Sequence, residues 1–381
     1  MSWRHRGPEI HRQATRGDGF CSALPPGGIA SRIGIILVAA LLSCVTTAPA
    51  GAQKVADRFP GTDWEQVDPV AAGWSVDKLK EARTWSHQIG STAVIVVHHG
   101  GVVAQWGDAA AKTPLASVRK SLLSALYGNA AERGDINLGQ TLAELGIDDN
   151  EPSLSAEEKS ATVRDLLECR SGVYHPALYE APDMAAKRPT RHSHKPGTFW
   201  YYNNWDVNTL GAIYEHAVRH SIFDALASEI AQPIGMQDYV ASDGRYVTGS
   251  SSVYPAYPID MSARDLARFA LLYLRKGRWQ DRQVVPADWV EDSARAYSQA
   301  DFAAGYGYLW WIGSLNDPAG SGVTLPEGSF FALGFGGQFT FVIPAYDLVI
   351  VHRAAGFQYG GRGFGDMNHL LALIFDAGHL R

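Results

Sequence analysis

Cysteine is scarce in this chain, and the short motifs that most often identify an enzyme are missing. Only 3 of the 381 residues are cysteine, and no Cys-x-x-Cys pair occurs. Gly-x-Ser-x-Gly, His-Glu-x-x-His and the Walker phosphate loop are absent as well. Because each motif places particular groups around a reacting centre, these absences argue against an ordinary α/β-hydrolase, a His-Glu-x-x-His metalloprotease and a P-loop nucleotide-binding enzyme.

Clusters of positive charge are lacking too. The chain has 33 Lys and Arg residues against 39 Asp and Glu residues, a net charge of −6. Binding to nucleic acid or anionic lipid depends on clustered Lys and Arg that release counterions, so we expect neither partner and predict a small-molecule substrate. The paired histidines, His98-His99 and His192-x-His194, have no carboxylate or third ligand at metal-binding spacing. We interpret them as surface loop residues and expect no metal or organic cofactor.

The first fifty residues differ from the rest. An arginine-rich lead precedes an apolar run from Ile33 to Leu42, and small residues follow up to Ala52. This order is typical of a secretory signal, and the apolar run is shorter than the roughly 20 residues that span a bilayer. We therefore predict a signal peptide over residues 1–52 and export to the periplasm or the exterior, with no stable membrane span. An alternative is lipoprotein processing at Leu41-Leu42-Ser43-Cys44, which leaves a lipid anchor on Cys44.

After this segment Cys169 is the one remaining cysteine, so no internal disulfide is expected and the fold must depend on its core. Periodicity predicts a strand hairpin early in the chain, helices in the middle, and strands followed by a helix at the end. The expected strands are 92–97, 102–106, 306–312, 330–333, 339–343 and 348–352, and the expected helices are 117–133, 161–169, 207–219, 262–275 and 367–377. We predict an α/β sheet layer from residues 53–116 and 246–381, and a mostly helical region over 117–245. A site is expected in the cleft between the two parts.

The pattern Ser-x-x-Lys occurs twice. Ser75 and Lys78 open a charged helix, in which Ser75 is interpreted as a helix cap. Ser117 and Lys120 instead follow the hairpin and begin an apolar helix. Residues i and i+3 share a helix face, so the Lys120 amine can reach the Ser117 hydroxyl, and burial would lower the pKa of the lysine. Ser117 is therefore predicted to be a nucleophile whose own backbone N–H faces a developing oxyanion.

Two further motifs follow: Pro196-Gly197-Thr198-Phe199-Trp200-Tyr201-Tyr202-Asn203-Asn204-Trp205 and Gly334-Phe335-Gly336-Gly337-Gln338. With Ser117 and Lys120, they make residues 70–380 resemble the serine β-lactamase and penicillin-binding-protein superfamily. The resemblance is to the branch of class C β-lactamases and D-alanyl-D-alanine carboxypeptidases, which includes esterases and 6-aminohexanoate-dimer hydrolases. It implies an α/β (α+β) fold of the β-lactamase/transpeptidase type, an antiparallel sheet flanked by helices with a mostly helical insertion.

The resemblance also implies roles for individual residues. Counting from Pro196-Gly197 selects Tyr202 and Asn204 from the two overlapping Tyr-x-Asn registers. Tyr202 would relay a proton between Ser117 and the leaving group, with its pKa lowered by the Lys120 charge. Asn204 would bind Lys120 and a substrate carbonyl or amide. The Gln338 backbone N–H would complete the oxyanion site.

The third motif departs from the family pattern, because Phe335 stands where the family has the cation of Lys-Thr-Gly or His-x-Gly. An apolar or uncharged substrate group is therefore expected beside Phe335, Gly336 and Gly337. The resemblance also implies an aromatic cleft wall formed by Tyr174, Tyr179, Trp205 and Phe335. We predict that Tyr174 and Trp205 are substrate-binding, with core packing as the alternative for each of the four residues.

We predict hydrolysis of an ester, amide or lactam through an acyl-enzyme, most similar to an aminohexanoate-oligomer amidase or a carboxylesterase. One alternative is a β-lactamase or D-alanyl-D-alanine carboxypeptidase. Another, of a different class, is a non-catalytic ligand-binding sensor with the same fold.

Overall fold

The computed structural model describes residues 57–300, 302–315, 323–355 and 363–380. These residues belong to one compact unit, Val55–Arg381. The predicted signal peptide, its cleavage point after Ala52 and the alternative lipidation site at Cys44 lie outside the described residues. Within the described ranges, no helix combines the length and the apolar character needed to cross a membrane.

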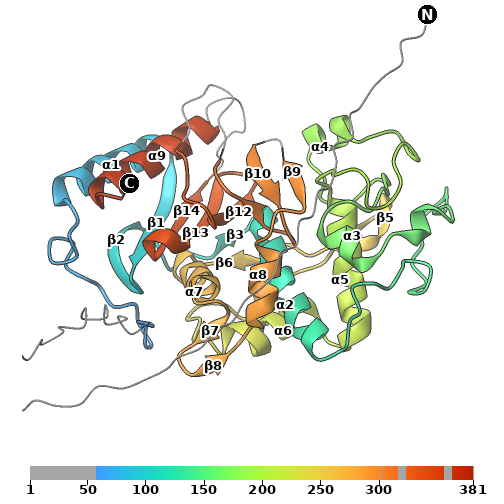
Figure 1. Ribbon diagram of the computed structural model, residues 1–381, viewed down its shortest axis with the longest axis horizontal. Coiled ribbons are helices and arrows are strands. Elements are labelled where there is room, and N and C mark those ends of the chain that lie inside the picture. Colours follow the sequence, from blue (N-terminus) through green and yellow to red (C-terminus); the bar gives the residue numbers. More distant parts are fainter. Residues whose placement is uncertain (1–56, 301, 316–322, 356–362, 381) are drawn as a thin grey trace, which may run out of the picture. The chain divides into compact units, whose positions relative to one another are not determined.

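An eight-stranded antiparallel sheet forms the centre of the fold, in the order β2-β1-β14-β13-β12-β11-β10-β9 (Figure 1). Its first two strands come from the N-terminal hairpin and the other six from the last part of the chain. The strands are β1 (Ser91–His98), β2 (Gly101–Gly107), β9 (Ser298–Ala300), β10 (Ala303–Tyr306), β11 (Trp311–Ile312), β12 (Phe330–Gly334), β13 (Gln338–Ile343) and β14 (Leu348–Ala354). The antiparallel pairing of β1 with β14 joins the N-terminal hairpin to the strands from the last part of the chain.

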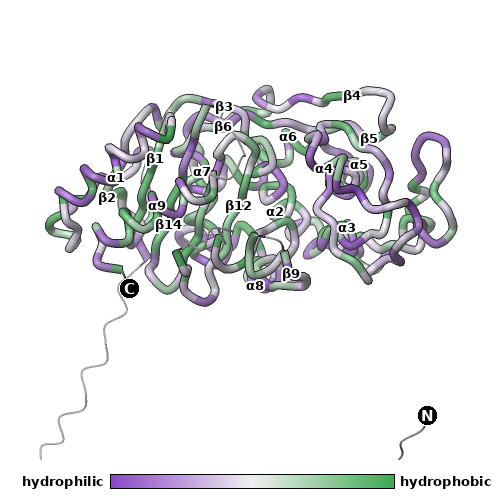
Figure 2. The backbone as a smooth tube through the Cα atoms, turned by 90° about the horizontal axis from the view of Figure 1, so that it is seen from above, coloured by the Kyte–Doolittle hydropathy of each residue, from purple (hydrophilic) through white to green (hydrophobic). Residues whose placement is uncertain are grey.

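Both faces of the sheet are covered, which explains why its strands are continuously apolar. Along β1, Val94 and Val96 belong to one buried cluster, whereas Ile95 and Val97 belong to the other. This alternation follows from the two-residue period of a strand. Figure 2 shows the same apolar character as green along β1 and β14.

Helices α1 (Val76–Gln88) and α9 (Gly363–Ala377) pack together over one face of the sheet, and α7 (Ala263–Leu274) packs on the other (Figure 1). Leu266, Leu271 and Leu272 of α7 are buried, and the helix contacts β13 and β14. The prediction of an antiparallel sheet flanked by helices is confirmed. The interpretation of Ser75 as a cap is also confirmed, since its hydroxyl accepts a hydrogen bond from the Lys78 backbone N–H at 3.4 Å.

The segment between β2 and β9 contains the remaining helices and three short strand pairs. It contains η1 (Ala116–Val118), α2 (Arg119–Glu132), η2 (Glu158–Ser160), α3 (Val163–Leu167), α4 (Pro182–Lys187), α5 (Asn204–Val218), α6 (Ile222–Ala225), η3 (Leu226–Ala231), η4 (Ala241–Asp243) and α8 (Ala287–Ser293). Three short strand pairs are β3 (Thr113–Pro114) with β6 (Asp260–Met261), β4 (Val247–Gly249) with β5 (Ser252–Ala256), and β7 (Arg278–Trp279) with β8 (Arg282–Gln283). A last 3-10 turn, η5 (Pro344–Tyr346), joins β13 to β14.

One expected strand differs from the structure. Residues 306–312 form the end of β10 and all of β11, separated by a turn in which Leu309 has a positive φ of 62°. The backbone N–H of Gly307 donates to the Trp310 carbonyl across this turn at 2.8 Å. The apolar run that suggested one strand is therefore a buried hairpin.

Candidate active site

Ser117 and Lys120 meet at the start of α2, as their spacing predicts. Ser117 lies in η1, the 3-10 turn that leads into the helix, and Lys120 lies in the first turn of α2. Lys120 Nζ is 3.0 Å from Ser117 Oγ. The lysine is 2% exposed, whereas the serine is partly exposed, so the amine is enclosed beneath a reachable hydroxyl.

Tyr202 and Asn204 complete the cluster. Lys120 Nζ lies 2.7 Å from the Tyr202 hydroxyl and 2.8 Å from Asn204 Oδ1. The alternative register is used elsewhere, because the Tyr201 hydroxyl donates to the Met184 carbonyl and Asn203 caps α5. The structure thus brings together the four side chains that the sequence predicted.

The orientation of the Asn204 amide is fixed by its second contact. Its Nδ2 donates to the Tyr179 carbonyl, which can only accept, so Oδ1 faces Lys120. A neutral lysine amine has two N–H groups and one lone pair. One N–H of Lys120 must point at Asn204 Oδ1, which can only accept. The hydroxyls of Ser117 and Tyr202 can each donate or accept, so the Ser117 O–H can point at the nitrogen lone pair.

Electrostatics favour this neutral form of the lysine. Burial lowers the pKa of Lys120 well below its usual value, and the neighbouring Arg119 charge lowers it further. Burial raises the pKa of Tyr202, with a smaller opposing effect from its hydrogen bond with Ser117. The prediction of a lowered Tyr202 pKa is therefore wrong. It assumed a charged Lys120, whereas desolvation acts on both groups and disfavours both charged forms.

Close backbone packing defines the other side of Ser117. A Cβ atom on Gly334 would lie 2.3 Å from the Leu115 carbonyl oxygen and 3.1 Å from the Ser117 backbone nitrogen. The end of β12 can approach the nucleophile only because this position has no side chain. Ala116, directly before Ser117, has a φ of 48°, a conformation that costs an L-residue roughly 1–3 kcal/mol.

The third motif forms the hairpin between β12 and β13. Gly334 pairs with Gln338, and Gly336 and Gly337 have positive φ angles of 84° and 85°. The Gln338 side chain is buried and its Nε2 donates to the carbonyls of Gly336 and Ala354, at 3.1 and 2.8 Å. The predicted oxyanion residue therefore also stabilises the hairpin through its side chain.

Arg353 is a residue that sequence reasoning missed. Its Nε donates to Gln338 Oε1 at 2.6 Å, and its Nη2 donates to the Thr113 and Pro114 carbonyls, at 2.8 and 3.1 Å. It thus joins the third motif to the segment that precedes Ser117. Its position in β14, a strand that is buried along its whole length, marks residue 353 as buried, but its partners lie far away in the sequence. His352, the preceding residue, contacts the Gly337 carbonyl through Nδ1 at 2.8 Å.

The aromatic residues expected along the cleft divide into two groups. Phe335 is 64% exposed at the hairpin tip, and Tyr179 is 45% exposed. Tyr174 is buried, and its hydroxyl contacts His194 Nδ1 at 3.0 Å. Trp205 is 1% exposed. The prediction that Tyr174 and Trp205 line an open cleft is therefore wrong, and both belong to the packed interior.

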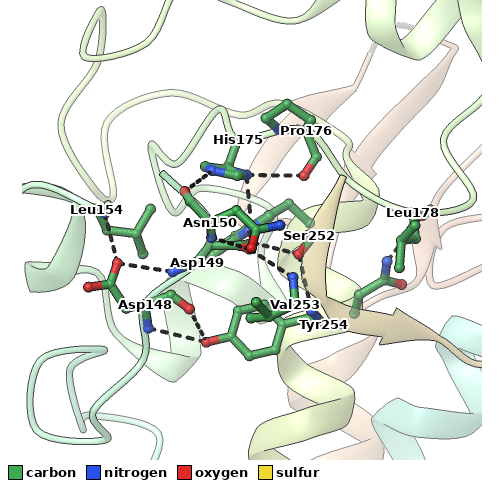
Figure 3. A network of polar contacts seen from close by, with 12 residues as sticks. Asp148, Asp149, Asn150, Leu154, His175, Pro176, Leu178, Ser252, Val253 and Tyr254 are labelled. Atoms are coloured by element: carbon green, nitrogen blue, oxygen red, sulfur yellow. Dashed lines mark hydrogen bonds and ion pairs between the residues drawn. The ribbon is translucent and has the colours of Figure 1, made fainter. Parts of the chain in front are cut away.

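Trp205 instead binds a buried carboxylate. Its Nε1 donates to Asp149 Oδ2 at 2.7 Å. The same carboxylate accepts from Ser252 Oγ at 2.5 Å and from the Val253 backbone N–H at 2.8 Å, as Figure 3 shows for the last two. Because Trp205 directly follows Asn204 in α5, this network fixes the helix end that presents Asn204 to the lysine.

The segment just before Tyr179, which includes His175 and Leu178, is anchored in the same region (Figure 3). His175 Nε2 lies 3.0 Å from the Asn150 carbonyl oxygen, and the Leu178 carbonyl accepts from Asn208 Nδ2 at 3.1 Å. Tyr179 then accepts from the Asn204 amide through its own carbonyl. Its exposed ring is therefore carried by a backbone that is bonded to α5.

Within the described ranges, no group of three or more His, Cys, Asp or Glu side chains is arranged to hold a metal ion.

Comparison with known proteins gives a family and a fold. The Beta-lactamase family model matches residues 76–372. A 6-aminohexanoate-dimer hydrolase homologue from Bacillus anthracis is 22% identical, with a TM-score of 0.60 over 84% of this chain and 87% of that one. A β-lactamase from Mycobacterium bovis is 21% identical, with a TM-score of 0.58 over 79% of this chain and 99% of that one.

A third similar structure is EstCE1, a hydrolase with promiscuous acyltransferase activity. It is 15% identical, with a TM-score of 0.56 over 80% of this chain and 100% of that one. At these identities the structures are similar to this chain in fold, and the activities in their names are those of the other proteins.

Proposed function

The chain belongs to the Beta-lactamase family, and on that basis we propose that it is a serine hydrolase that forms an acyl-enzyme on Ser117. The observation that carries the proposal is the contact of one buried amine, Lys120 Nζ, with Ser117 Oγ, the Tyr202 hydroxyl and Asn204 Oδ1, at 3.0, 2.7 and 2.8 Å. A nucleophile in contact with a base, itself oriented by further groups, is the arrangement that acyl transfer requires.

In the proposed acylation step, the neutral Lys120 amine takes the proton of Ser117 as Oγ bonds to the substrate carbonyl carbon. The carbonyl electron pair moves onto oxygen, and the backbone N–H groups of Ser117 and Gln338 bind the resulting oxyanion. The intermediate then collapses and the bond to the leaving group breaks. The proton passes from Lys120 through the Tyr202 hydroxyl to the departing oxygen or nitrogen, which leaves the acyl group on Ser117.

Deacylation uses the same groups in reverse. A water molecule gives its proton to the Tyr202–Lys120 pair as its oxygen attacks the acyl carbon. The second tetrahedral intermediate releases the carboxylic acid, and Ser117 recovers its proton. The raised pKa of Tyr202 and the lowered pKa of Lys120 support this sequence, because both groups can then exchange a proton without becoming charged at rest.

For the substrate we propose an ester or a short amide with an uncharged group beside the β12–β13 hairpin, as in an aminohexanoate-oligomer amidase or a carboxylesterase. The exposed ring of Phe335 supports this preference, since it offers apolar contact where a carboxylate would require a cation. The names of two similar structures, the 6-aminohexanoate-dimer hydrolase homologue and EstCE1, agree with this class. Export remains part of the proposal.

The test compares two substitutions at the two Ser-x-x-Lys patterns. Ser117→Ala should abolish hydrolysis of nitrophenyl esters and short amides and prevent labelling by a fluorophosphonate probe. Ser75→Ala removes the helix cap that lies outside the proposed site, and it should leave both readouts at the wild-type level. Nitrocefin tests the β-lactamase alternative. If wild-type protein hydrolyses none of these compounds and no probe labels Ser117, the enzyme proposal fails and the binding-sensor alternative is favoured.

A further inference from the structure

Arg119 is a buried cation with no acidic partner among the residues that the structure describes. It is 1% exposed, and its Nη1 donates to the Ala116 carbonyl at 3.1 Å. Its Nε and Nη2 are buried without a hydrogen-bond partner among the described residues, so no carboxylate there is bonded to either atom. The guanidinium carbon lies 4.9 Å from the centre of the Tyr257 ring and 5.6 Å from that of Tyr179. Because burial of an unpaired charge is costly, a cation in this state requires an explanation.

Its position in the fold suggests one. Arg119 is the first residue of α2, directly before Lys120, and the first turn of this helix has no acidic residue. The positive end of the helix dipole acts on the same turn. Lys120 therefore experiences two positive influences from its own helix.

Within the described part of the chain, the surroundings of Lys120 provide no negative charge in return. The groups that face it are hydroxyls, an amide, a thiol and one cation: Ser117, Tyr202, Asn204, Cys169 and Arg119. Burial raises the pKa of the Cys169 thiol to about 12. Asp206 interacts with that thiol, but burial raises the pKa of its carboxyl to about 8, so it is mostly protonated at neutral pH.

We propose that Arg119 is a positioning residue whose uncompensated charge keeps the amine of Lys120 neutral, so that the amine can accept the Ser117 proton. The inference rests on the proposed hydrolase function and adds to it the means by which the base is maintained. When an arginine and a lysine are buried side by side, the lysine loses its proton, because the guanidinium does not deprotonate in proteins. The stacking on Tyr179 and Tyr257 offsets part of the cost of the buried guanidinium.

The test follows the rate of Ser117 labelling by a fluorophosphonate probe between pH 5 and 10. In wild type the rate should rise with pH as Lys120 loses its proton. Arg119→Gln retains a donor for the Ala116 carbonyl but removes the charge, and it should move the midpoint upward by about one pH unit. Labelling would then be about tenfold slower below the midpoint and equal to wild type on the plateau. Arg119→Lys keeps a positive charge, so its pH midpoint should lie close to that of wild type.

Arg268→Gln is the matched control. This arginine is also 1% exposed, and its guanidinium donates to the backbone carbonyls of Gly61, Thr62 and Ile234, outside the proposed site. Its substitution should lower the melting temperature and leave the pH midpoint unchanged. A uniform loss of labelling at every pH in Arg119→Gln, with no shift of the midpoint, would show a merely structural role and overturn the proposal.

Two further readouts cover other outcomes. If Arg119→Gln does not fold, the charge of Lys120 can be measured in wild type from the 13C chemical shift of its ε-carbon. Lys120→Met serves to assign that signal. A neutral amine at pH 8 supports the role of Arg119, and an ammonium overturns it. Wild-type protein that is never labelled at Ser117 would instead remove the proposed hydrolase function, whatever the charge of Lys120.

Discussion

Replacement of Gly334 by alanine tests the geometry of the proposed site with a single methyl group. That methyl would lie 2.3 Å from the Leu115 carbonyl oxygen, about 1 Å short of the 3.4 Å at which ordinary van der Waals contact begins. The backbone around Ser117 or the end of β12 must therefore move by about 1 Å. A displacement of that size between reacting groups costs about 100-fold in rate, or about 2.7 kcal/mol of transition-state stabilisation.

The assay separates this effect from instability. Overpacking costs about 1–3 kcal/mol of folding free energy, so Gly334→Ala should also show a lower urea midpoint. Gly244→Ala is the control, because its methyl would meet the Phe223 ring at 2.0 Å, away from the proposed site. Both variants should be destabilised, but only Gly334→Ala should label Ser117 about 100-fold more slowly per folded molecule. A folded Gly334→Ala protein that labels at the wild-type rate would refute the reasoning.

Three further predictions concern the surroundings of the site. Asp149→Ala should lower the free energy of unfolding in urea by about 2–4 kcal/mol, because an indole N–H, a hydroxyl and a backbone N–H lose a buried acceptor; an unchanged midpoint would contradict this. Phe335→His should increase hydrolysis of carboxylate-bearing substrates relative to neutral ones, and an unchanged ratio would count against the proposed specificity. Because burial raises the pKa of Asp206 from 3.8 to about 8, its ionisation should reduce stability progressively between about pH 4 and pH 8. Asp206→Asn should show a smaller loss over that range in urea unfolding, and an equal slope would refute the assignment.

The parts of the site that could be predicted from the sequence are those that depend on local spacing. Ser117 and Lys120 are three residues apart on one helical turn, so the hydrogen bond between them follows from helix geometry. Tyr202 and Asn204 could be chosen because family spacing around Pro196-Gly197 singles out one register. The strands could also be predicted from the sequence, and β13 and β14 are apolar along most of their length, which is typical of a sheet covered on both faces.

The error at Trp205 concerns the direction in which its side chain points. Trp205 follows Asn204 in the sequence, but successive residues on a helix project about 100° apart. When Asn204 faces Lys120, its neighbour must turn toward the interior, where Trp205 binds Asp149. Arg353 could not be found in advance, because its partners Thr113 and Pro114 are about 240 residues away in the chain.

The bond network of Arg353 has a consequence for how this protein acquires activity during folding. The arginine lies in β14, the strand of the sheet that comes last in the sequence, and it binds the segment before the nucleophile as well as Gln338. The helix that contains Lys120 can form early from local contacts. The hydrogen bonds of Arg353 to Gln338, Thr113 and Pro114 can form only after β14 has paired with β1. Recovery of Ser117 reactivity during refolding should therefore follow completion of the whole sheet and lag behind the appearance of helical circular dichroism.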